Sequence, residues 1–369
     1  MSLEGLADEQ QLSAARLIPA ALAAGALSAA DVVHYGVSVE QRGRSHPVYC
    51  VSVGGQARFF VKTFGPRRGA TDGLAEREWA LQALAQERPA VAALVPPAWP
   101  WLHDAAGVPT TKVVANAAVA GAEAWTLDHN SGPDGSQRAW NDLVQALVPP
   151  LAAFHRATRD LARPGASVPT CLEPATPWGL SLMDGDAAPE LWAGPATAVL
   201  LREAAADATF VAALRAVRSL WRPLALIHAD LKHDNVLVER SGYGLKVHVL
   251  DWEMARIGDP AWDLASLSAR LAALRQDGPP WPDRDMAAAA TLVGHYAAAS
   301  GLAVPGLAQR VMSYASVVLL MMCLQHGSTL APGGDLGSAR SLLMKARSTL
   351  HRIDNLSQAL AAQAQGARA

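Results

Sequence analysis

Cysteine is scarce in this 369-residue chain, and its three copies lie far apart in the sequence. Cys50, Cys171 and Cys323 form no C-x-x-C pair, so the sequence indicates neither a zinc site nor a disulfide framework. An excess of one charge is also lacking, because 31 basic and 33 acidic residues leave a formal net charge of −2. Without a long basic run, the charge pattern argues against a nucleic-acid partner.

Long hydrophobic runs are missing as well, although 51% of the residues are hydrophobic and can fill a core. The longest run, Val317 to Leu324, is far shorter than a membrane span. The chain starts with a polar, acidic segment, residues 1–11, and an alanine-rich stretch at residues 12–30 is typical of a helix rather than of an export signal. These features predict a cytoplasmic protein that does not reside in a membrane.

Acidic and amide side chains gather in one short part of the sequence. The residues His-Ala-Asp-Leu-Lys-His-Asp-Asn occupy positions 228–235, and Asp-Trp-Glu follows at positions 251–253. Between them, residues 236–250 contain an apolar strand, a turn-rich break at residues 241–244 and a second, alternating strand. This pattern predicts a β-hairpin with its turn near Tyr243.

The hairpin would bring Asn235 and Asp251 together, since each is eight positions from Tyr243. Residues equidistant from the turn of an antiparallel pair face each other at roughly 5 Å between Cα atoms. An amide and a carboxylate beside an open cleft suit Mg²⁺ carrying a nucleotide, so both are predicted metal ligands. Asp230 lies just before the hairpin and is the predicted catalytic base for an acceptor hydroxyl. The alternative is a polar loop with scattered acids.

The H-x-D-x-x-x-x-N loop, the D-W-E phrase and Gly-Asp-Pro-Ala-Trp-Asp-Leu-Ala at positions 258–265 resemble the aminoglycoside phosphotransferase and choline kinase group, which are relatives of the protein kinases. The resemblance runs from about Val37 to Leu274. It implies an α+β, two-lobed protein-kinase-like fold that uses ATP and Mg²⁺. The implied division is an N-terminal helical extension at 1–35, a nucleotide-binding N-lobe with a small mixed β-sheet at 36–118, and a larger, mainly helical C-lobe with the catalytic loop and acceptor site at 119–369.

Hydrophobic periodicity agrees with this division. It predicts strands and one helix up to about Asn116, and helices from Ala139 onward. Terminal helices are expected near residues 286–299, 307–325 and 336–362.

The resemblance further implies a lysine on a strand and a glutamate on the next helix, a pair that holds the α- and β-phosphates. A hairpin signal over residues 48–62, with Gly54-Gly55 at its turn, ends at Lys62. Glu78 matches the start of the family's E-x-x-L-x-x-L phrase, and Glu76 is the competing choice. The alternatives are a lysine extending into water and a solvated helix face.

Two nucleotide-binding segments are expected from the same resemblance. The phosphate-covering loop falls at residues 40–47, where a glycine, basic side chains and a hydroxyl could approach phosphate, although a basic surface turn is the alternative. The adenine-binding connector falls at residues 113–118, where backbone groups would do the binding. The predicted cofactor-binding residues are Gly43, Arg44 and Ser45 in the loop, and Val114 and Asn116 in the connector.

Several residues near the predicted base have supporting roles. Asp263 corresponds in the resembled family to a residue that buttresses the catalytic loop. His228 is expected to be a buried, hydrogen-bonded orienting residue, and His155 a packed helical histidine. Lys232 stands where Ser/Thr protein kinases place a lysine against the transferred phosphate, and is predicted to be catalytic with Asp230 unless it faces solvent. Glu253 contributes to a second metal shell or stays hydrated.

The predicted function is transfer of the γ-phosphate of ATP to a hydroxyl of a small molecule, namely an aminoglycoside, an amino alcohol or a sugar-like acceptor. Residues 163–195, rich in proline and glycine with tryptophans and acids, form part of the acceptor wall or are a variable surface insertion. The alternative functions are a kinase of Ser or Thr in a peptide or protein, and a nucleotide-binding scaffold without turnover.

Overall fold

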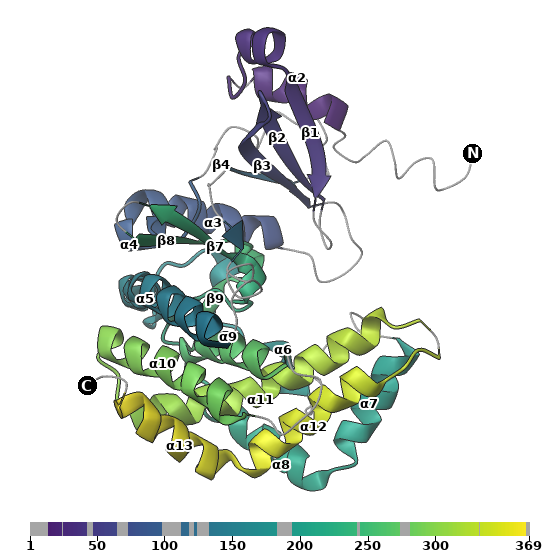
Figure 1. Ribbon diagram of the computed structural model, residues 1–369, viewed down its shortest axis with the longest axis vertical. Helices are drawn as coiled ribbons and strands as arrows, with labels where there is room; N and C mark the ends of the chain where they lie inside the picture. Colours follow the sequence, from purple (N-terminus) through teal and green to yellow (C-terminus); the bar gives the residue numbers. More distant parts are fainter. Residues whose placement is uncertain are drawn as a thin grey trace. The chain divides into compact units, whose positions relative to one another are not determined.

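The computed structural model describes most of the chain, and Figure 1 shows its helices and strands. The described residues are 14–23, 25–42, 47–64, 73–97, 112–117, 122–123, 133–182, 194–241, 244–273, 281–331 and 333–366. The chain divides into two compact units. The first unit comprises Met1–Gly121 and His248–Glu253, and the second comprises Ala122–Val247 and Met254–Ala369.

The first unit contains a four-stranded antiparallel sheet in the order β1-β2-β3-β4. Its strands are β1 (Val37–Arg42), β2 (Val48–Val53), β3 (Gln56–Phe64) and β4 (Lys112–Ala117). Gly54 and Gly55 join β2 to β3 with φ of 57° and 79°, a left-handed conformation that a side chain would disfavour. The predicted hairpin is therefore confirmed, although β3 continues two residues beyond Lys62.

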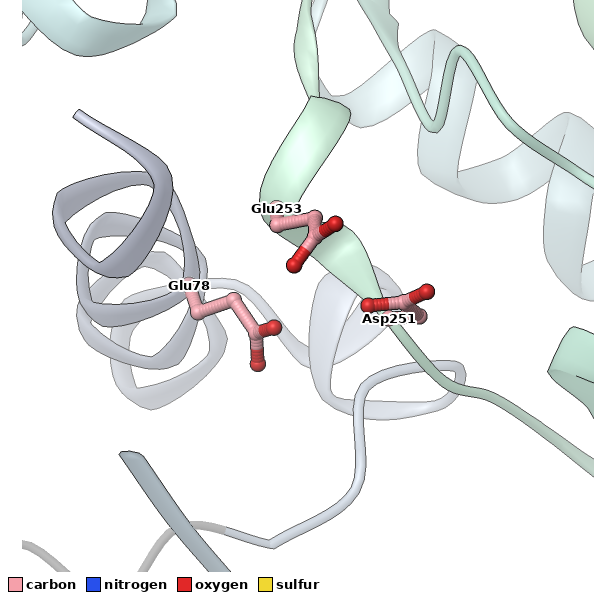
Figure 2. A group of neighbouring side chains, drawn as sticks. All are labelled: Glu78, Asp251 and Glu253. Atoms are coloured by element: carbon pink, nitrogen blue, oxygen red, sulfur yellow. The ribbon is translucent and has the colours of Figure 1, made fainter. Parts of the chain in front are cut away.

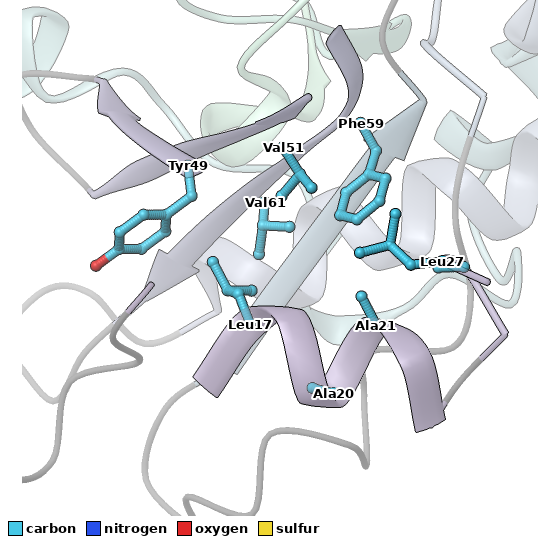
Figure 3. Close-up of a cluster of buried hydrophobic side chains, with 9 residues drawn as sticks. Leu17, Ala20, Ala21, Leu27, Tyr49, Val51, Phe59 and Val61 are labelled. Carbon is cyan, nitrogen blue, oxygen red and sulfur yellow. The ribbon is translucent and has the colours of Figure 1, made fainter. Parts of the chain in front are cut away.

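One face of this sheet packs against helix α2 (Ala14–Ala23). Alternate strand residues supply the apolar face, and Figure 3 shows their side chains directed toward the helix. The buried cluster consists of Leu17, Ala20, Ala21, Ala26, Leu27, Tyr49, Val51, Phe59 and Val61. The helix predicted in the alanine-rich segment is thus present, and it lies in the same unit as the sheet. Lys62 follows Val61 and points to the opposite face, because neighbouring strand residues alternate.

Helix α3 (Leu74–Glu87) and the short helix α4 (Pro89–Ala92) follow in the first unit. Helix α3 begins four residues before Glu78, so the E-x-x-L-x-x-L phrase starts inside the helix and not at its first residue. Its buried residues include Leu81, which is fully inaccessible. The N–H of Val249 donates to the carbonyl oxygen of Leu94 at 2.8 Å, which ties the segment at His248–Glu253 to the end of α4.

The second unit holds small strands beside many helices. Strands β5 (Ala122–Glu123), β7 (Val236–Ser241) and β8 (Gly244–Val249) form a sheet in the order β5-β7-β8, and the last two residues of β8 belong to the first unit. This pairing confirms the predicted hairpin, whose turn at residues 242–243 lies outside the described residues. Strands β6 (Ala225–Ile227) and β9 (Arg256–Gly258) pair antiparallel, and β6 leads directly into the predicted catalytic loop.

Helices make up most of the second unit. The α-helices are α5 (Pro133–Ala157), α6 (Trp178–Ser181), α7 (Pro195–Ala205), α8 (Ala208–Arg218), α9 (Ala261–Ala273), α10 (Asp283–Ser300), α11 (Val304–Thr329), α12 (Gly337–His351) and α13 (Ile353–Gly366). The single helix expected over 336–362 is instead two, because Arg352 leaves helical geometry with φ of −111° and ψ of 18°. With the small antiparallel sheet of the first unit, the chain has the predicted α+β fold.

Helix α11 is long and apolar enough to cross a membrane by length and composition. However, 78% of its most apolar part is buried inside the protein. Buried residues occur all along the helix, from Val304 to Gly327, as expected for a central helix covered by others.

Candidate active site

A buried lysine of the first unit lies among three carboxylates. The ammonium of Lys62, on β3, is 2.9 Å from Glu78 Oε1 and 2.7 Å from Glu253 Oε2. It also donates to Asp251 Oδ1. Only 13% of the Lys62 side chain is exposed. Figure 2 shows the three carboxylates reaching toward a common space from α3 and from the segment after β8.

The local backbone explains how the two C-terminal acids reach the lysine. Asp251 has φ of 65°, which is uncommon for a residue with a side chain, and it turns the chain into the short 3₁₀-helix η9 (Trp252–Met254). The guanidinium of Arg77, on α3, donates to the carbonyl oxygen of Glu253 at 3.1 Å. The turn is therefore anchored to the helix that carries Glu78.

Burial and charge shift the pKa values of this cluster in opposite ways. Burial lowers the pKa of the Lys62 ammonium, but the three neighbouring carboxylates raise it more, so the lysine stays charged. For Glu253, burial raises the pKa of the carboxyl to about 7, while the positive charge of Lys62 opposes that rise. The cluster thus contains a lysine, Lys62, that keeps its positive charge, and an acid, Glu253, that is protonated more readily than an ordinary glutamate.

The acids offer oxygen ligands of the kind that a divalent cation needs. Ligand oxygens of Glu78, Asp251 and Glu253 all lie within 4.8 Å of one another. Carboxylate oxygens are hard ligands, so this donor set fits magnesium, which completes its shell with waters and phosphates. Of the three side chains Asp251 is the most exposed, at 32%, and is the best placed to meet a ligand from solvent.

The second unit holds the loop that carries Asp230. Ala229 has φ of 67°, and backbone groups of this residue and of the one before it form hydrogen bonds with side chains of helix α9. The N–H groups of His228 and Ala229 donate to the two carboxylate oxygens of Asp263, each at 2.9 Å. The indole N–H of Trp262 donates to the carbonyl oxygen of Ala229 at 3.2 Å. The predicted buttressing role of Asp263 is confirmed.

Asp230 is partly exposed, and its carboxylate lies 2.7 Å from the ammonium of Lys232. The N–H of Asp230 donates to Nδ1 of His228, which is fully buried, as expected of an orienting residue. The side-chain N–H of Asn235 donates to the carbonyl oxygen of Asp230 at 3.0 Å. This bond uses the side-chain nitrogen of Asn235 and leaves its side-chain oxygen, Oδ1, available as a ligand.

The predicted residues divide between the two units. Lys62, Glu78 and Asp251 come together in the first unit, and Asp230, Lys232 and Asn235 come together in the second. Asn235 and Asp251 belong to different units, so their approach remains a prediction. Their roles toward a nucleotide or an acceptor also remain predictions.

The structure describes the two predicted nucleotide-binding segments only in part. Gly43, Arg44 and Ser45 lie outside the described residues, and the start of the predicted loop at Glu40 to Arg42 is part of strand β1. Val114 and Asn116 lie in β4, paired with Lys62 and Phe60, so most of the predicted connector is part of a sheet strand. The two adjacent valines, Val113 and Val114, are β-branched and favour such a strand. The role of this segment in adenine binding remains a prediction.

Comparison with known proteins identifies the family. A family model described as the phosphotransferase enzyme family matches residues 40–302, which is more than half of the chain. The chain belongs to the phosphotransferase enzyme family. It is therefore an enzyme that transfers a phosphoryl group, and its family relatives act on small molecules. A search of the curated proteins found no match.

Solved structures share the fold of this phosphotransferase at low sequence identity. A microcompartment-associated aminopropanol kinase is 18% identical, with a TM-score of 0.56 over 88% of this chain and 96% of that chain. An amicoumacin kinase, solved with AMP-PNP, Ca²⁺ and its ligand, is 14% identical, with a TM-score of 0.58 over 96% of both chains. An ethanolamine kinase of Plasmodium vivax is 12% identical, with a TM-score of 0.55 over 90% of this chain and 87% of that chain.

Sequence reasoning undervalued two residues of this phosphotransferase. Glu253 is not hydrated, because it is buried against Lys62 and only 14% of its side chain is exposed. His155 is more than a packed helical residue, because its ring contacts Asp263 at 3.2 Å. Its partner lies 108 positions along the chain, and no local pattern in a single sequence reports such a contact. The D-x-E spacing was the one available signal for Glu253.

Proposed function

We propose that this phosphotransferase moves the γ-phosphate of ATP, with Mg²⁺, to a hydroxyl group of an aminoglycoside, an amino alcohol or a sugar-like acceptor. The observation that carries the proposal is the ammonium of Lys62 held by Glu78 and Asp251. A charged lysine beside an acid that can bind metal is the arrangement that a nucleotide triphosphate requires. Membership of the phosphotransferase family supplies the reaction class.

In this proposal Asp251 and Asn235 hold the magnesium ion, which when bound would neutralise charge on the phosphates. Asp251 contributes a carboxylate oxygen. Asn235 contributes its amide oxygen, because its N–H group is already engaged with the Asp230 carbonyl. The hairpin formed by β7 and β8 connects these two residues, which supports their predicted approach.

Lys62 binds and orients the α- and β-phosphates. Its charge is secured by the surrounding carboxylates, and Glu78 keeps it pointing to the face of the sheet opposite α2. The Glu78 side chain is only 6% exposed, so its removal would leave the buried charge of Lys62 without this partner. Val114 and Asn116, or the residues that follow β4, and the loop residues Gly43, Arg44 and Ser45 are proposed to contact the rest of the nucleotide.

Asp230 orients the acceptor hydroxyl and takes its proton as the oxygen attacks the γ-phosphorus. The carboxylate is partly exposed, so an acceptor from solvent can reach it. Lys232 lies against this carboxylate and would place positive charge where negative charge moves during the transfer. The bond between the γ-phosphorus and the oxygen that bridges it to the β-phosphate breaks, and ADP leaves with that oxygen. The proton of the acceptor hydroxyl is then on the Asp230 carboxyl, and the phosphorylated product is released.

The acceptor is proposed to be a small hydroxyl compound that carries an amine. The solved relatives are named as kinases of aminopropanol, ethanolamine and amicoumacin. Residues 163–195 remain the proposed acceptor wall, and residues 183–193 of this segment lie outside the described residues. The reaction is placed in the cytoplasm, a proposal supported by the three free cysteines.

The experiment is a screen for ATP consumption across aminoglycosides, amino alcohols, sugars and Ser/Thr peptides, with product mass as the second readout. Asp230→Asn should keep Mg-ATP binding and lower transfer by roughly 10²-fold or more. Asp234→Asn is the matched control, because Asp234 is an exposed acid of the same loop. Unchanged turnover of Asp230→Asn would reject the assignment. Phosphorylation of peptides alone would favour the protein-kinase alternative, and nucleotide binding without transfer would favour a scaffold.

A further inference from the structure

A buried hydrogen-bonded path runs from helix α10 to the loop that carries Asp230. The hydroxyl of Tyr296 lies 2.7 Å from Nδ1 of His155, and Nε2 of His155 lies 3.2 Å from Asp263 Oδ2. Asp263 in turn holds the N–H groups of His228 and Ala229. Tyr296, His155 and Asp263 are each at most 1% exposed. The path therefore crosses the core of the second unit without access to water.

The acceptor groups along this path fix which atoms carry hydrogens. Both oxygens of Asp263 face N–H donors, so the His155 nitrogen facing it must be a donor. An imidazole that carries its one hydrogen on Nε2 has an acceptor at Nδ1. The hydroxyl of Tyr296 can satisfy that acceptor, and burial raises the pKa of Tyr296 so that it keeps its proton.

The far end of the path is a backbone that needs support. Ala229 has φ of 67°, and a residue with a side chain is strained in this region of backbone conformation. Such strain persists only where surrounding contacts determine the conformation. The Asp263 carboxylate supplies two of these contacts, and its position depends on the His155 ring on its other side.

We propose that Tyr296 is a positioning residue for catalysis, acting through the His155 imidazole to fix Asp263 and, with it, the loop that presents Asp230. Tyr296 donates to Nδ1 and holds the ring with its Nε2–H toward Asp263. Loss of the hydroxyl frees the ring to rotate or change tautomer, so Asp263 loses a donor and the Ala229 peptide loosens. The catalytic part of this proposal rests on the proposed function, whereas its structural part does not.

Tyr296→Phe removes one oxygen atom and keeps the ring. Its matched control is Tyr314→Phe, because Tyr314 is equally buried and its hydroxyl donates to another buried carboxylate, Asp259 Oδ2, at 3.0 Å. With an acceptor found in the screen described above, Tyr296→Phe should lower kcat by about 10-fold and leave KM for ATP within about twofold of the wild-type value. Tyr314→Phe should lose thermal stability to a similar extent but keep kcat. Equal kcat in the two variants would overturn the proposal.

A double-mutant cycle tests whether the effect passes through the histidine. In the proposal, Tyr296→Phe has no further effect on kcat once His155→Gln has removed the imidazole. Multiplied losses in the double variant would show that the hydroxyl acts by another route and would overturn the assignment.

Two measurements do not depend on turnover and so separate this inference from the proposed function. Hydrogen exchange at the amides of His228 and Ala229 should be about 10-fold faster in Tyr296→Phe than in Tyr314→Phe at matched global stability. In the unaltered protein, ¹⁵N shifts of His155 should report a hydrogen on Nε2 and none on Nδ1. Equal loop exchange in the two variants, or an Nδ1–H tautomer, would overturn the inference. Absent phosphoryl transfer in the wild type would instead reject the proposed function and leave these two tests decisive.

Discussion

The ammonium of Lys62 lies 2.9 Å from Glu78 Oε1, and this ion pair joins strand β3 to helix α3. The two residues are 16 positions apart, and Glu78 rather than Glu76 makes the pair. Because both side chains are largely buried, removal of one charge leaves the other poorly compensated. The pair is therefore a sensitive point for nucleotide binding.

Glu78→Gln should raise KM for ATP by about 10-fold, because Lys62 loses the partner that orients it while Asp251 and Glu253 keep it charged. Steady-state kinetics over a range of ATP concentrations measures the change. Glu76→Gln on the same helix is the control and should stay within about twofold. Matching increases in both variants would show that the helix, and not this pair, is responsible.

The family resemblance implied the Lys62–Glu78 pair, and local patterns in the sequence predicted much of the fold. The double glycine at 54–55, for example, reports a turn formed by neighbours in the chain. The pairing of residues 112–117 with β3 as an edge strand could not be read from the segment itself, because its partner strand is distant in the sequence. The break between α12 and α13 at Arg352 could not be predicted, because no glycine or proline marks it in the sequence.

The contacts that could not be predicted join distant parts of the sequence. Lys62 meets Asp251 across 189 positions, and His155 meets Asp263 across 108. Resemblance to a family supplied the residue types at Lys62, Asp251 and Asp263, but it said nothing of Tyr296, which lies in a helix without a motif. Tertiary packing places such a residue, and periodicity reports only that its helix exists.

Asp251→Asn should abolish the contribution of magnesium to nucleotide binding. The variant keeps the shape of the side chain but loses the charge that a divalent cation needs. Titration calorimetry with ATP should show an affinity at least about 10-fold weaker than wild type when Mg²⁺ is present. With EDTA the two proteins should bind ATP about equally. Weakening of the same size with and without the metal would assign Asp251 a structural role.

Lys232→Met should slow transfer by about 10-fold without a change in KM for ATP, since the ammonium touches Asp230 and acts on charge that develops during the reaction. Single-turnover measurements with saturating acceptor test this expectation. Lys246→Met, an exposed lysine on β8, is the matched control. Normal single-turnover rates in Lys232→Met would mean that this lysine only faces solvent.

Glu253 should make the metal-free protein less stable as pH rises. Burial raises the pKa of its carboxyl from 4.5 to about 7, so the folded protein holds this proton more tightly than the unfolded chain does. The stabilisation is complete below pH 4.5 and is lost as pH rises through about 7. Relative to Glu253→Gln, which stays neutral, the wild type should therefore lose roughly 1–3 kcal/mol of unfolding free energy over this window.

Urea denaturation in EDTA at pH 4.5 and pH 7.5 gives the comparison for Glu253. Glu87→Gln serves as the control, because Glu87 is an exposed acid of the same unit and its replacement should leave the pH dependence as in the wild type. A parallel pH dependence in wild type and Glu253→Gln would contradict the upward shift in pKa.

Helix α2 should contribute to the stability of the first unit as part of its core. Leu17 is 1% exposed and packs against the sheet, whereas Leu22 on the same helix is 36% exposed. Leu17→Ala should therefore lower the unfolding free energy by about 2–5 kcal/mol, since it removes buried apolar atoms and leaves a cavity. Leu22→Ala should cost no more than about 1 kcal/mol. Urea denaturation of both variants measures the difference in unfolding free energy. Equal, small losses of unfolding free energy would mean that α2 is not part of the core.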